Sequence, residues 1–329
     1  MKVPVSGRLG DRSKFSGARL KGNSLLTVAF FGAGGEGSMA PLEAVAKHHE
    51  VIALVSPLQA RSWIRGVVRR TLTRSGLGTL AAMAKWARRR DVPLINAVSG
   101  NEPSLAARLK QLAPDVICVS AFPWLLGSEI LQTARRAALN VHPSLLPRHR
   151  GPNPFFWLYY NDDRRTGVTV HRMNEFADAG EILGQCAFDL PRGFAVDRLY
   201  AKNALCGAQL LVRVLEDLET GRSEPVAQDE RLSTRAPRVA RGTPAVNFAE
   251  WDVERVWHFL SGLCPRRREP LHDPDNREVR YASVLGFTRD DCHRAAGMVE
   301  RASFGWNLFC RGGSIQLADA RNAQRGDKR

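Results

Sequence analysis

The chain has 329 residues, of which 44% are hydrophobic and 25% charged, which is ordinary for a soluble globular protein and enough for two domains. No apolar run approaches the ~20 residues that a membrane-spanning helix needs, and residues 1–24 lack the apolar stretch of a secretory signal, so we expect a cytoplasmic protein without a membrane partner. The formal net charge of +15 attracts polyanions such as RNA, although an arginine-rich composition with solvated faces gives the same number.

The chain begins with a basic arm and a glycine-rich turn. Residues 1–24 carry six lysines and arginines against one acid, and their low apolar content predicts disorder. A strand-like run, Leu25–Phe31, leads into the stretch 32–37 (GAGGEG) and then a helix from Met39 to His48. This is the glycine spacing of a dinucleotide site, but the next strand, 50–56, ends without the acid that would hold a ribose. A tight turn into a helix explains the glycines equally well.

The following segments alternate between helix and strand patterns. Residues 57–75 carry five arginines around Trp63, and both RNA contact and an ordinary amphipathic helix remain open there. Helical patterns at 77–90 and 104–112 then alternate with strand-like runs at 92–95 and 115–121. This alternation predicts an α/β fold with a doubly wound, mostly parallel, Rossmann-like sheet. Ligands on such a sheet bind at the carboxyl ends of the strands.

A polar pair ends the next strand. Asn140 and His142 are two residues apart, so their side chains share one face of an extended strand. Pro143 ends the strand because it cannot donate to the sheet. A carboxylate, Asp178, arrives from a later loop. An isolated pair of this kind is most simply a strand end with a hydrogen-bonded histidine, so the longer pattern around it has to decide.

That longer pattern resembles the folate-dependent formyltransferases, a family that includes glycinamide ribonucleotide, methionyl-tRNA and amino-sugar formyltransferases. Residues 140–152 (NVHPSLLPRHRGP) match the family's Asn-x-His-Pro-Ser-Leu-Leu-Pro-x-x-Arg-Gly-Pro, and 178–180 match its loop of Asp, a small residue and Gly. Residues 166–173 (TGVTVHRM) extend the match. The resemblance implies that Asn140, His142 and Asp178 are catalytic. It also implies that 10-formyltetrahydrofolate is the co-substrate, without a metal, and that a primary amine accepts the formyl group.

The resemblance further implies where the substrates bind. The apolar loop after strand 115–121 lies where family members seat the pterin ring, and loops around the catalytic residues complete that site. The expected folate-binding residues are Phe122, Trp124, Leu125, Leu126, Ser144, Leu145, Pro147 and Ala177. The expected residues for the other substrate are Gly32, Gly34, Arg148 and Arg150. For each, ordinary loop packing or a solvated arginine is the alternative.

Formyl transfer needs donors aimed at the oxygen that becomes negative, and losing one such donor costs roughly 3 kcal/mol. Asn140 and His142 would supply N–H groups, and Asp178 would raise the pKa of His142 and relay a proton through water. The six scattered cysteines show no metal-ligand spacing, and none lies within the motif. Ser144 lacks a nucleophile elbow, so no covalent nucleophile is expected. We expect His149 and His171 to be structural.

A second unit follows the long helical pattern at 196–218. We predict a catalytic domain at 25–219, a linker at 220–245, a second domain at 246–321 and a polar tail at 322–329. A helix near 253–260 and four short strand-like runs predict a small OB-like β-barrel in the second domain. This unit looks like the carboxy-terminal domain of the methionyl-tRNA formyltransferases.

The expected acceptor is therefore the amino group of methionyl-tRNA, with tRNA meeting the basic surfaces. The alternative is a small amine such as a nucleotide-linked amino sugar or hydroxyornithine. It stays open because the wording typical of the tRNA enzymes is missing at 57–75 and at 264–268 (CPRRR). Two other hypotheses are disfavoured. The intact Asn, His and Asp argue against a silent nucleic-acid-binding protein, and the missing ribose acid argues against an NAD-dependent enzyme. The oligomeric state is not predicted.

Overall fold

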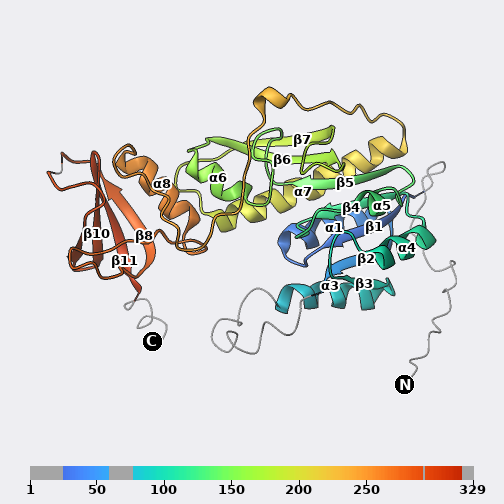
Figure 1. Ribbon diagram of the computed structural model, residues 1–329, viewed down its shortest axis with the longest axis horizontal. Helices are drawn as coiled ribbons and strands as arrows, with labels where there is room; N and C mark the ends of the chain where they lie inside the picture. The colour runs from blue at the N-terminus through green and yellow to red at the C-terminus, as the bar shows by residue number, and fades with distance from the viewer. Residues whose placement is uncertain (1–24, 59–76, 292, 321–329) are drawn as a thin grey trace, which may run out of the picture.

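The computed structural model describes residues 25–58, 77–291 and 293–320 (Figure 1). The predictions for the basic arm 1–24, for the arginine-rich stretch from residue 59 and for the tail 322–329 lie outside the described residues. Among the helices of the described residues, none is both long and apolar enough to cross a membrane. The five cysteines in the described ranges are free thiols.

One seven-stranded sheet carries most of the chain, in the order β3-β2-β1-β4-β5-β6-β7. β1 to β5 pair in parallel, and β6 and β7 are antiparallel. The predicted doubly wound, mostly parallel α/β sheet is therefore confirmed, whereas its antiparallel edge strand β7 was not predicted. The strands are β1 (Thr27–Gly32), β2 (Glu50–Pro57), β3 (Leu94–Ala97), β4 (Val116–Ser120), β5 (Ala137–His142), β6 (Arg165–Arg172) and β7 (Ile182–Asp189).

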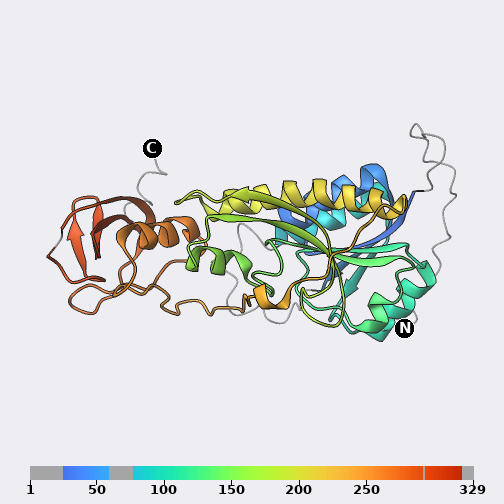
Figure 2. The same ribbon diagram turned by 90° about the horizontal axis from the view of Figure 1, so that it is seen from above.

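Helices cover both faces of this sheet because its central strands are apolar on both sides. Strand residues such as Phe30 and Leu139 pack against α1 (Glu36–His48), α3 (Leu77–Arg90) and α7 (Val196–Glu219). Residues of the opposite face, such as Phe31, pack against α4 (Pro103–Leu112) and the short α5 (Ser128–Leu131). Figure 2 shows the yellow α7 running along one face beside the blue α1.

A smaller antiparallel sheet follows, in the order β8-β11-β10-β9, and packs against α8 (Val253–Leu263). Asp252 begins α8 because its carboxylate accepts the N–H of Arg255 at 2.8 Å. Closure of this sheet into the expected OB-like barrel stays a prediction. The strands are β8 (Tyr281–Thr288), β9 (Val299–Ala302), β10 (Gly305–Cys310) and β11 (Gly313–Asp319).

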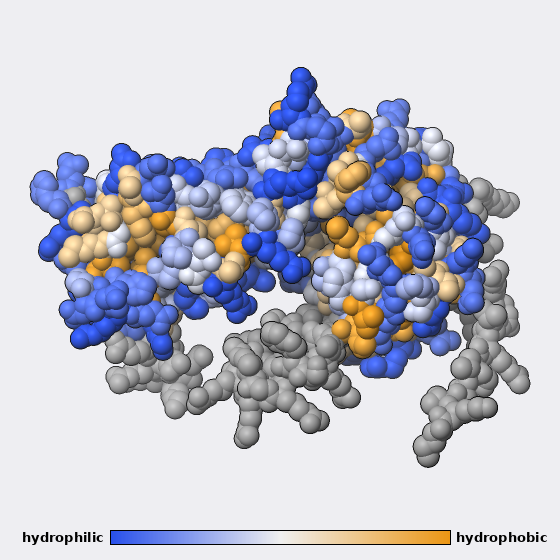
Figure 3. Space-filling view, in the orientation of Figure 1, coloured by the Kyte–Doolittle hydropathy of each residue, from blue (hydrophilic) through white to orange (hydrophobic). Residues whose placement is uncertain are grey.

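The small sheet shares a hydrophobic core with the large one. That core contains Phe156 and Tyr159 of α6 (Pro154–Tyr160), Leu199 of α7 and Phe259 of α8. Figure 1 shows α8 between α6 and the small sheet. The outer face in Figure 3 is mostly hydrophilic, broken by apolar areas over both parts of the molecule. The two sheets are thus joined through buried apolar side chains, and the loop between β5 and α6 lies close to that junction.

Candidate active site

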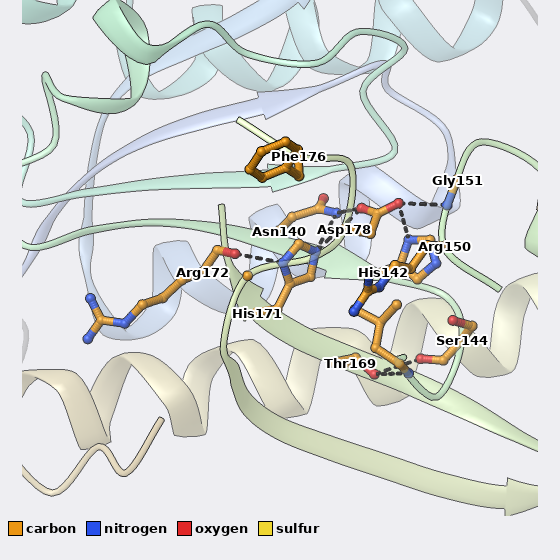
Figure 4. Close-up of polar contacts among 12 residues, drawn as sticks. Asn140, His142, Ser144, Arg150, Gly151, Thr169, His171, Arg172, Phe176 and Asp178 are labelled. Carbon is orange, nitrogen blue, oxygen red and sulfur yellow. Dashed lines mark hydrogen bonds and ion pairs between the residues drawn. The ribbon is translucent and has the colours of Figure 1, made fainter. Parts of the chain in front are cut away.

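The polar pair lies where β5 ends, in the middle of the large sheet. Asn140 is opposite Val119 of β4 and His171 of β6, and His142 is opposite Thr169. β5 ends at His142, directly before Pro143, as the sequence predicts. Asn140 and His142 share a face, and both point toward the loop that precedes β7 (Figure 4).

Asp178 lies on that loop and joins the pair. Its Oδ1 accepts from Asn140 Nδ2 at 3.2 Å, and its Oδ2 lies 3.6 Å from His142 Nδ1. Oδ2 also accepts the main-chain N–H of Gly151 at 2.8 Å. The loop turns tightly, with a φ of +53° at Asp178. Gly180 allows this turn, because a Cβ there would lie 2.0 Å from the carbonyl oxygen of Arg172. The structure thus brings Asn140, His142 and Asp178 together.

The hydrogen bonds of His142 fix which ring nitrogen carries the proton. Nε2 lies 2.9 Å from the carbonyl oxygen of His149, which can only accept, so Nε2–H donates. The neutral ring therefore turns the lone pair of Nδ1 toward the Asp178 carboxylate. Two acceptors then face each other, and a proton between them would turn this contact into an ion pair.

Burial lowers the pKa of the His142 ring below its ordinary value of 6.5. Asp178 raises this pKa, as expected from the sequence, but burial together with the neighbouring rings of His171 and His149 outweighs it. Burial alone would raise the pKa of the Asp178 carboxyl, whereas His142, His171 and the N–H of Gly151 hold it well below its usual range. Near neutral pH the pair is thus a carboxylate beside a neutral imidazole.

His171 is a fourth member of the cluster, although its sequence context predicts only a structural role. Its Nδ1–H donates to the carbonyl of Arg172 at 2.7 Å, so Nε2 is an acceptor in the neutral ring. Nε2 lies 3.2 Å from Asn140 Nδ2 and 3.5 Å from Asp178 Oδ1. Only the antiparallel register that sets His171 opposite Asn140 reveals this contact, and the strand pattern of the sequence does not give that register.

The Asn140 amide is oriented by these neighbours. Its Nδ2 faces two acceptors, Asp178 Oδ1 and His171 Nε2. Reversing the amide would set its oxygen against both acceptors, which costs free energy because neither contact would hold a proton. Both N–H groups therefore have protein partners here, and donating to a third group would weaken one of these contacts.

The loop after His142 is braced internally. The Ser144 hydroxyl donates to the carbonyl of Arg148 at 2.7 Å, and the carbonyl of Ser144 accepts from Thr169. Ser144 is fully buried, whereas Leu145, Pro147 and, on the Asp178 loop, Ala177 are half-buried. Folate binding by these four residues stays a prediction.

The two arginines of the loop have protein partners. Arg148 is exposed and pairs with Asp163 at 2.6 Å. Arg150 is buried, with its guanidinium bonded to Gln228 and Glu230. A substrate contact by Arg150 would require the guanidinium to exchange these partners.

The loop after β4 uses most of its apolar side chains for packing. The ring of Phe122 lies edge-on to Phe31 and to Trp124, both at 5.4 Å between centroids, and Leu126 is buried in the same core. Leu125 is 60% exposed. Folate binding by Phe122, Trp124, Leu125 and Leu126 stays a prediction.

The glycine-rich turn is explained by its own packing. A Cβ on Gly32 would lie 2.8 Å from the side chain of Ser38. The Ser38 hydroxyl accepts from the N–H of Ala33 at 3.0 Å and donates to the carbonyl of Ser120 at 2.8 Å. Gly34 has a φ of +82°, which favours glycine. Substrate contact by Gly32 and Gly34 remains a prediction.

Two cavities lie away from the cluster of Asn140, His142 and Asp178. One, of about 370 Å³, lies between α6, α7 and the segment after α8, and its lining includes Phe156, Tyr200 and Arg267. The other, of about 170 Å³, lies under the loop of residues 145–149. Neither is lined by Asn140, His142 or Asp178. The expected convergence of these three side chains is therefore present, but these two cavities do not supply the pterin pocket expected beside them.

Comparison with known proteins gives consistent matches. A family model described as "Formyl transferase" matches residues 47–215. Methionyl-tRNA formyltransferase of Anaeromyxobacter dehalogenans is 40% identical over 184 residues, which are 56% of this chain and 59% of that protein. The chain thus matches less than two thirds of that relative's length.

Two solved structures share the fold. An N-formyltransferase from Helicobacter canadensis, in complex with folinic acid and dTDP-3-aminofucose, has a TM-score of 0.65 at 14% identity, covering 90% of this chain and 99% of that one. HypX from Aquifex aeolicus, in complex with tetrahydrofolic acid, has a TM-score of 0.59 at 17% identity, covering 89% and 44%.

Proposed function

We propose that this chain, which belongs to the formyl transferase family, transfers a formyl group from 10-formyltetrahydrofolate to a primary amine. The observation that carries the proposal is the cluster at the end of β5, where an amide, a neutral imidazole and a carboxylate meet within 3.2 to 3.6 Å. The exposed Leu125 and the main chain around it would hold the pterin, and the co-substrate would supply the activated one-carbon unit.

The reaction we propose exchanges one C–N bond for another. The amine nitrogen attacks the formyl carbon and loses a proton, the bond from that carbon to the folate nitrogen breaks, and the folate nitrogen gains a proton. Asn140 would donate to the formyl oxygen as negative charge builds on it, since fixed donors of this kind supply the largest catalytic contribution. Its Nδ2 would then share its hydrogens with the oxygen at the expense of His171 or Asp178.

His142 would move the proton. In its neutral form the lone pair of Nδ1 accepts the proton that the attacking amine loses, and Asp178 stabilises the imidazolium that results. Nδ1 then gives this proton to the departing folate nitrogen. This differs from the sequence-based expectation that His142 donates to the oxygen, because its Nε2–H is already used by the carbonyl of His149.

The acceptor that we propose is the amino group of methionyl-tRNA. Support comes from the 40% identical relative, from the second unit built on α8 and its sheet, which we infer to be an OB-like domain, and from the net charge of +15. Contact with tRNA through the basic surfaces, and a cytoplasmic location, belong to the same proposal.

A small amine remains the second candidate. The stretch 264–268 (CPRRR) departs from the wording of the tRNA enzymes. The fold match to a sugar N-formyltransferase spans 90% of this chain, including the second unit.

An acceptor panel separates the two candidates. The protein is incubated with 10-formyltetrahydrofolate and either methionyl-tRNA, uncharged tRNA, or nucleotide-linked amino sugars, and the release of tetrahydrofolate is followed. We expect release with methionyl-tRNA and none with uncharged tRNA. Release with an amino sugar alone would replace the first acceptor with the second, and release with no amine at all would contradict transfer.

A further inference from the structure

Resting on the proposed function, we infer that Gln228 is a positioning residue for Asp178, and that it acts together with Arg150 and Glu230. We call these three residues the brace. None of the three touches the amide, imidazole or carboxylate of the catalytic cluster directly. They hold the main chain on which the carboxylate is mounted.

Gln228 is the centre of the brace. Its Nε2 donates to the carbonyl oxygens of Asp178 at 2.9 Å and of Gly180 at 2.7 Å. Its Oε1 accepts from Nε and Nη2 of Arg150 at 3.0 and 2.7 Å. Both hydrogens and both lone pairs of the amide are thus used. The orientation of this side chain is therefore fixed by its partners.

Arg150 anchors the brace from below the surface. Its side chain is 3% exposed, and Nη1 and Nη2 form a two-pronged ion pair with the Glu230 carboxylate, each at 2.8 Å. A buried guanidinium needs such partners, since losing one leaves an unpaired charge. Arg150 is therefore a fixed reference point for Gln228.

The same part of the chain also holds the Asp178 carboxylate. Gly151, the neighbour of Arg150, donates its main-chain N–H to Asp178 Oδ2 at 2.8 Å (Figure 4). The Asp178 carboxylate is thus bound by Gly151. The Asp178 main-chain carbonyl is bound by Gln228, which in turn is held by Arg150. Because the side chain and the main chain of Asp178 are both held by residues 150 and 151, the carboxylate keeps its place beside His142 despite the left-handed φ of +53° at Asp178.

The segment that carries Gln228 is itself tied down at both ends. Val226 exchanges two main-chain hydrogen bonds with Ile182, each at 2.8 Å. Farther on, Arg150 N–H donates to the Thr234 carbonyl at 2.9 Å, and Ala236 N–H to the Arg150 carbonyl at 2.7 Å. Residues 226–236 therefore cross the Asp178 loop as a strap. The segment that leads toward the second unit is part of the frame of the site.

Three variants test this assignment. Gln228→Ala removes the amide. Gln228→Glu keeps the shape and the contact with Arg150 but presents a carboxylate oxygen to the two carbonyls. Arg231→Ala is the control on the same segment, because its side chain is 88% exposed and pairs with Asp229. We expect both Gln228 variants to lower kcat about 30-fold with KM values within threefold, since misplacement by about 1 Å can cost up to ~10²-fold. Arg231→Ala should match wild type.

A second readout does not need activity. The Gly151 N–H bonds the carboxylate, so its ¹H–¹⁵N signal reports where the carboxylate is. We expect this signal in Gln228→Ala to move in the same direction as in Asp178→Asn, and to stay in place in Arg231→Ala. An unmoved signal, a kcat within twofold of wild type, or a loss carried by KM alone overturns the assignment. If the wild type transfers no formyl group, the proposed function fails, and the Gly151 signal still decides the brace.

Discussion

Two buried histidines can be compared, His142 in the proposed catalytic cluster and His258 in the core that joins the two sheets. Both are at least 95% removed from solvent, both lie within 4 Å of a carboxylate, and burial lowers the pKa of both. The carboxylates differ. Asp162, beside His258, already pairs with Arg192 at 2.6 Å, whereas the partners of Asp178 are main-chain, amide and imidazole groups.

The direction of the ring protons differs as well. His258 accepts the N–H of Gly193 on Nδ1 at 3.0 Å, so its Nε2–H faces Asp162. His142 donates from Nε2 to a carbonyl, so its lone pair faces Asp178. Both rings are therefore buried. Only in His142 does the unprotonated ring nitrogen face a carboxylate, and the contacts of that carboxylate named above include no arginine. We take that difference to be what makes a proton acceptor.

The largest expected effect comes from replacing each of the two aspartates with asparagine. Asp178→Asn should lower kcat by about 10³-fold, because the imidazolium formed during transfer loses its counter-charge and Asn140 Nδ2 also loses the carboxylate that orients it. Asp162→Asn should keep kcat within threefold and instead lower the free energy of unfolding by about 1–2 kcal/mol, because Arg192 loses an ion-pair partner. Tetrahydrofolate release and thermal unfolding measure the two quantities. Equal activity in both variants would remove the contrast between the sites.

The parts of the cluster that the sequence predicts involve residues close together in the chain. The spacing of Asn140 and His142 predicted a shared face, and Pro143 predicted the strand end, since both depend only on strand geometry. The α/β sheet followed from alternating helix and strand patterns. The proton on His142 Nε2 did not follow, because it depends on where the His149 carbonyl lies after the loop folds back.

Contacts between residues far apart in the chain could not be predicted from the sequence either. His171 depends on the antiparallel register of β5 and β6, and Gln228 reaches Asp178 across 50 residues. Arg150 shows the limit most clearly. Its place in the motif suggested substrate binding, but only the fold brings Gln228 and Glu230, 78 and 80 residues away, to its guanidinium.

Removing the rings gives the next largest effect. His142→Ala should lower kcat by about 10²-fold, the usual contribution of a positioned general base, while the protein stays folded. His258→Ala should leave kcat within threefold but cost roughly 3 kcal/mol of stability, because it leaves a cavity beside Tyr159, whose ring centroid lies 5.0 Å away. Urea unfolding and initial rates distinguish the two. If His142→Ala lost activity only because the variant unfolds, this assignment would be contradicted.

The smallest effects are those of pH. In the proposed mechanism neutral His142 is the active form, and burial holds its pKa below 6.5, so the acid limb of kcat/KM should have its midpoint below that value. A midpoint above 6.5 would mean that Asp178 dominates burial.

For His258 the consequence of the lowered pKa is for stability. Burial lowers its folded pKa to about 4, below the ordinary 6.5 of the unfolded chain, so its contribution is complete above pH 6.5 and declines as the pH falls toward 4. That decline is up to about 3 kcal/mol, and a His258→Phe variant should lack it. An unchanged pH dependence of unfolding in that variant would assign the acid sensitivity to other groups.

The most direct test follows the one-carbon unit itself. The wild-type protein is given 10-formyltetrahydrofolate labelled in the formyl carbon together with methionyl-tRNA and, separately, an amino-sugar panel. We predict label on the acceptor amine in an amount equal to the tetrahydrofolate released, and at least 10²-fold less in His142→Ala. Label released as free formate, or transferred equally well by His142→Ala, would contradict it.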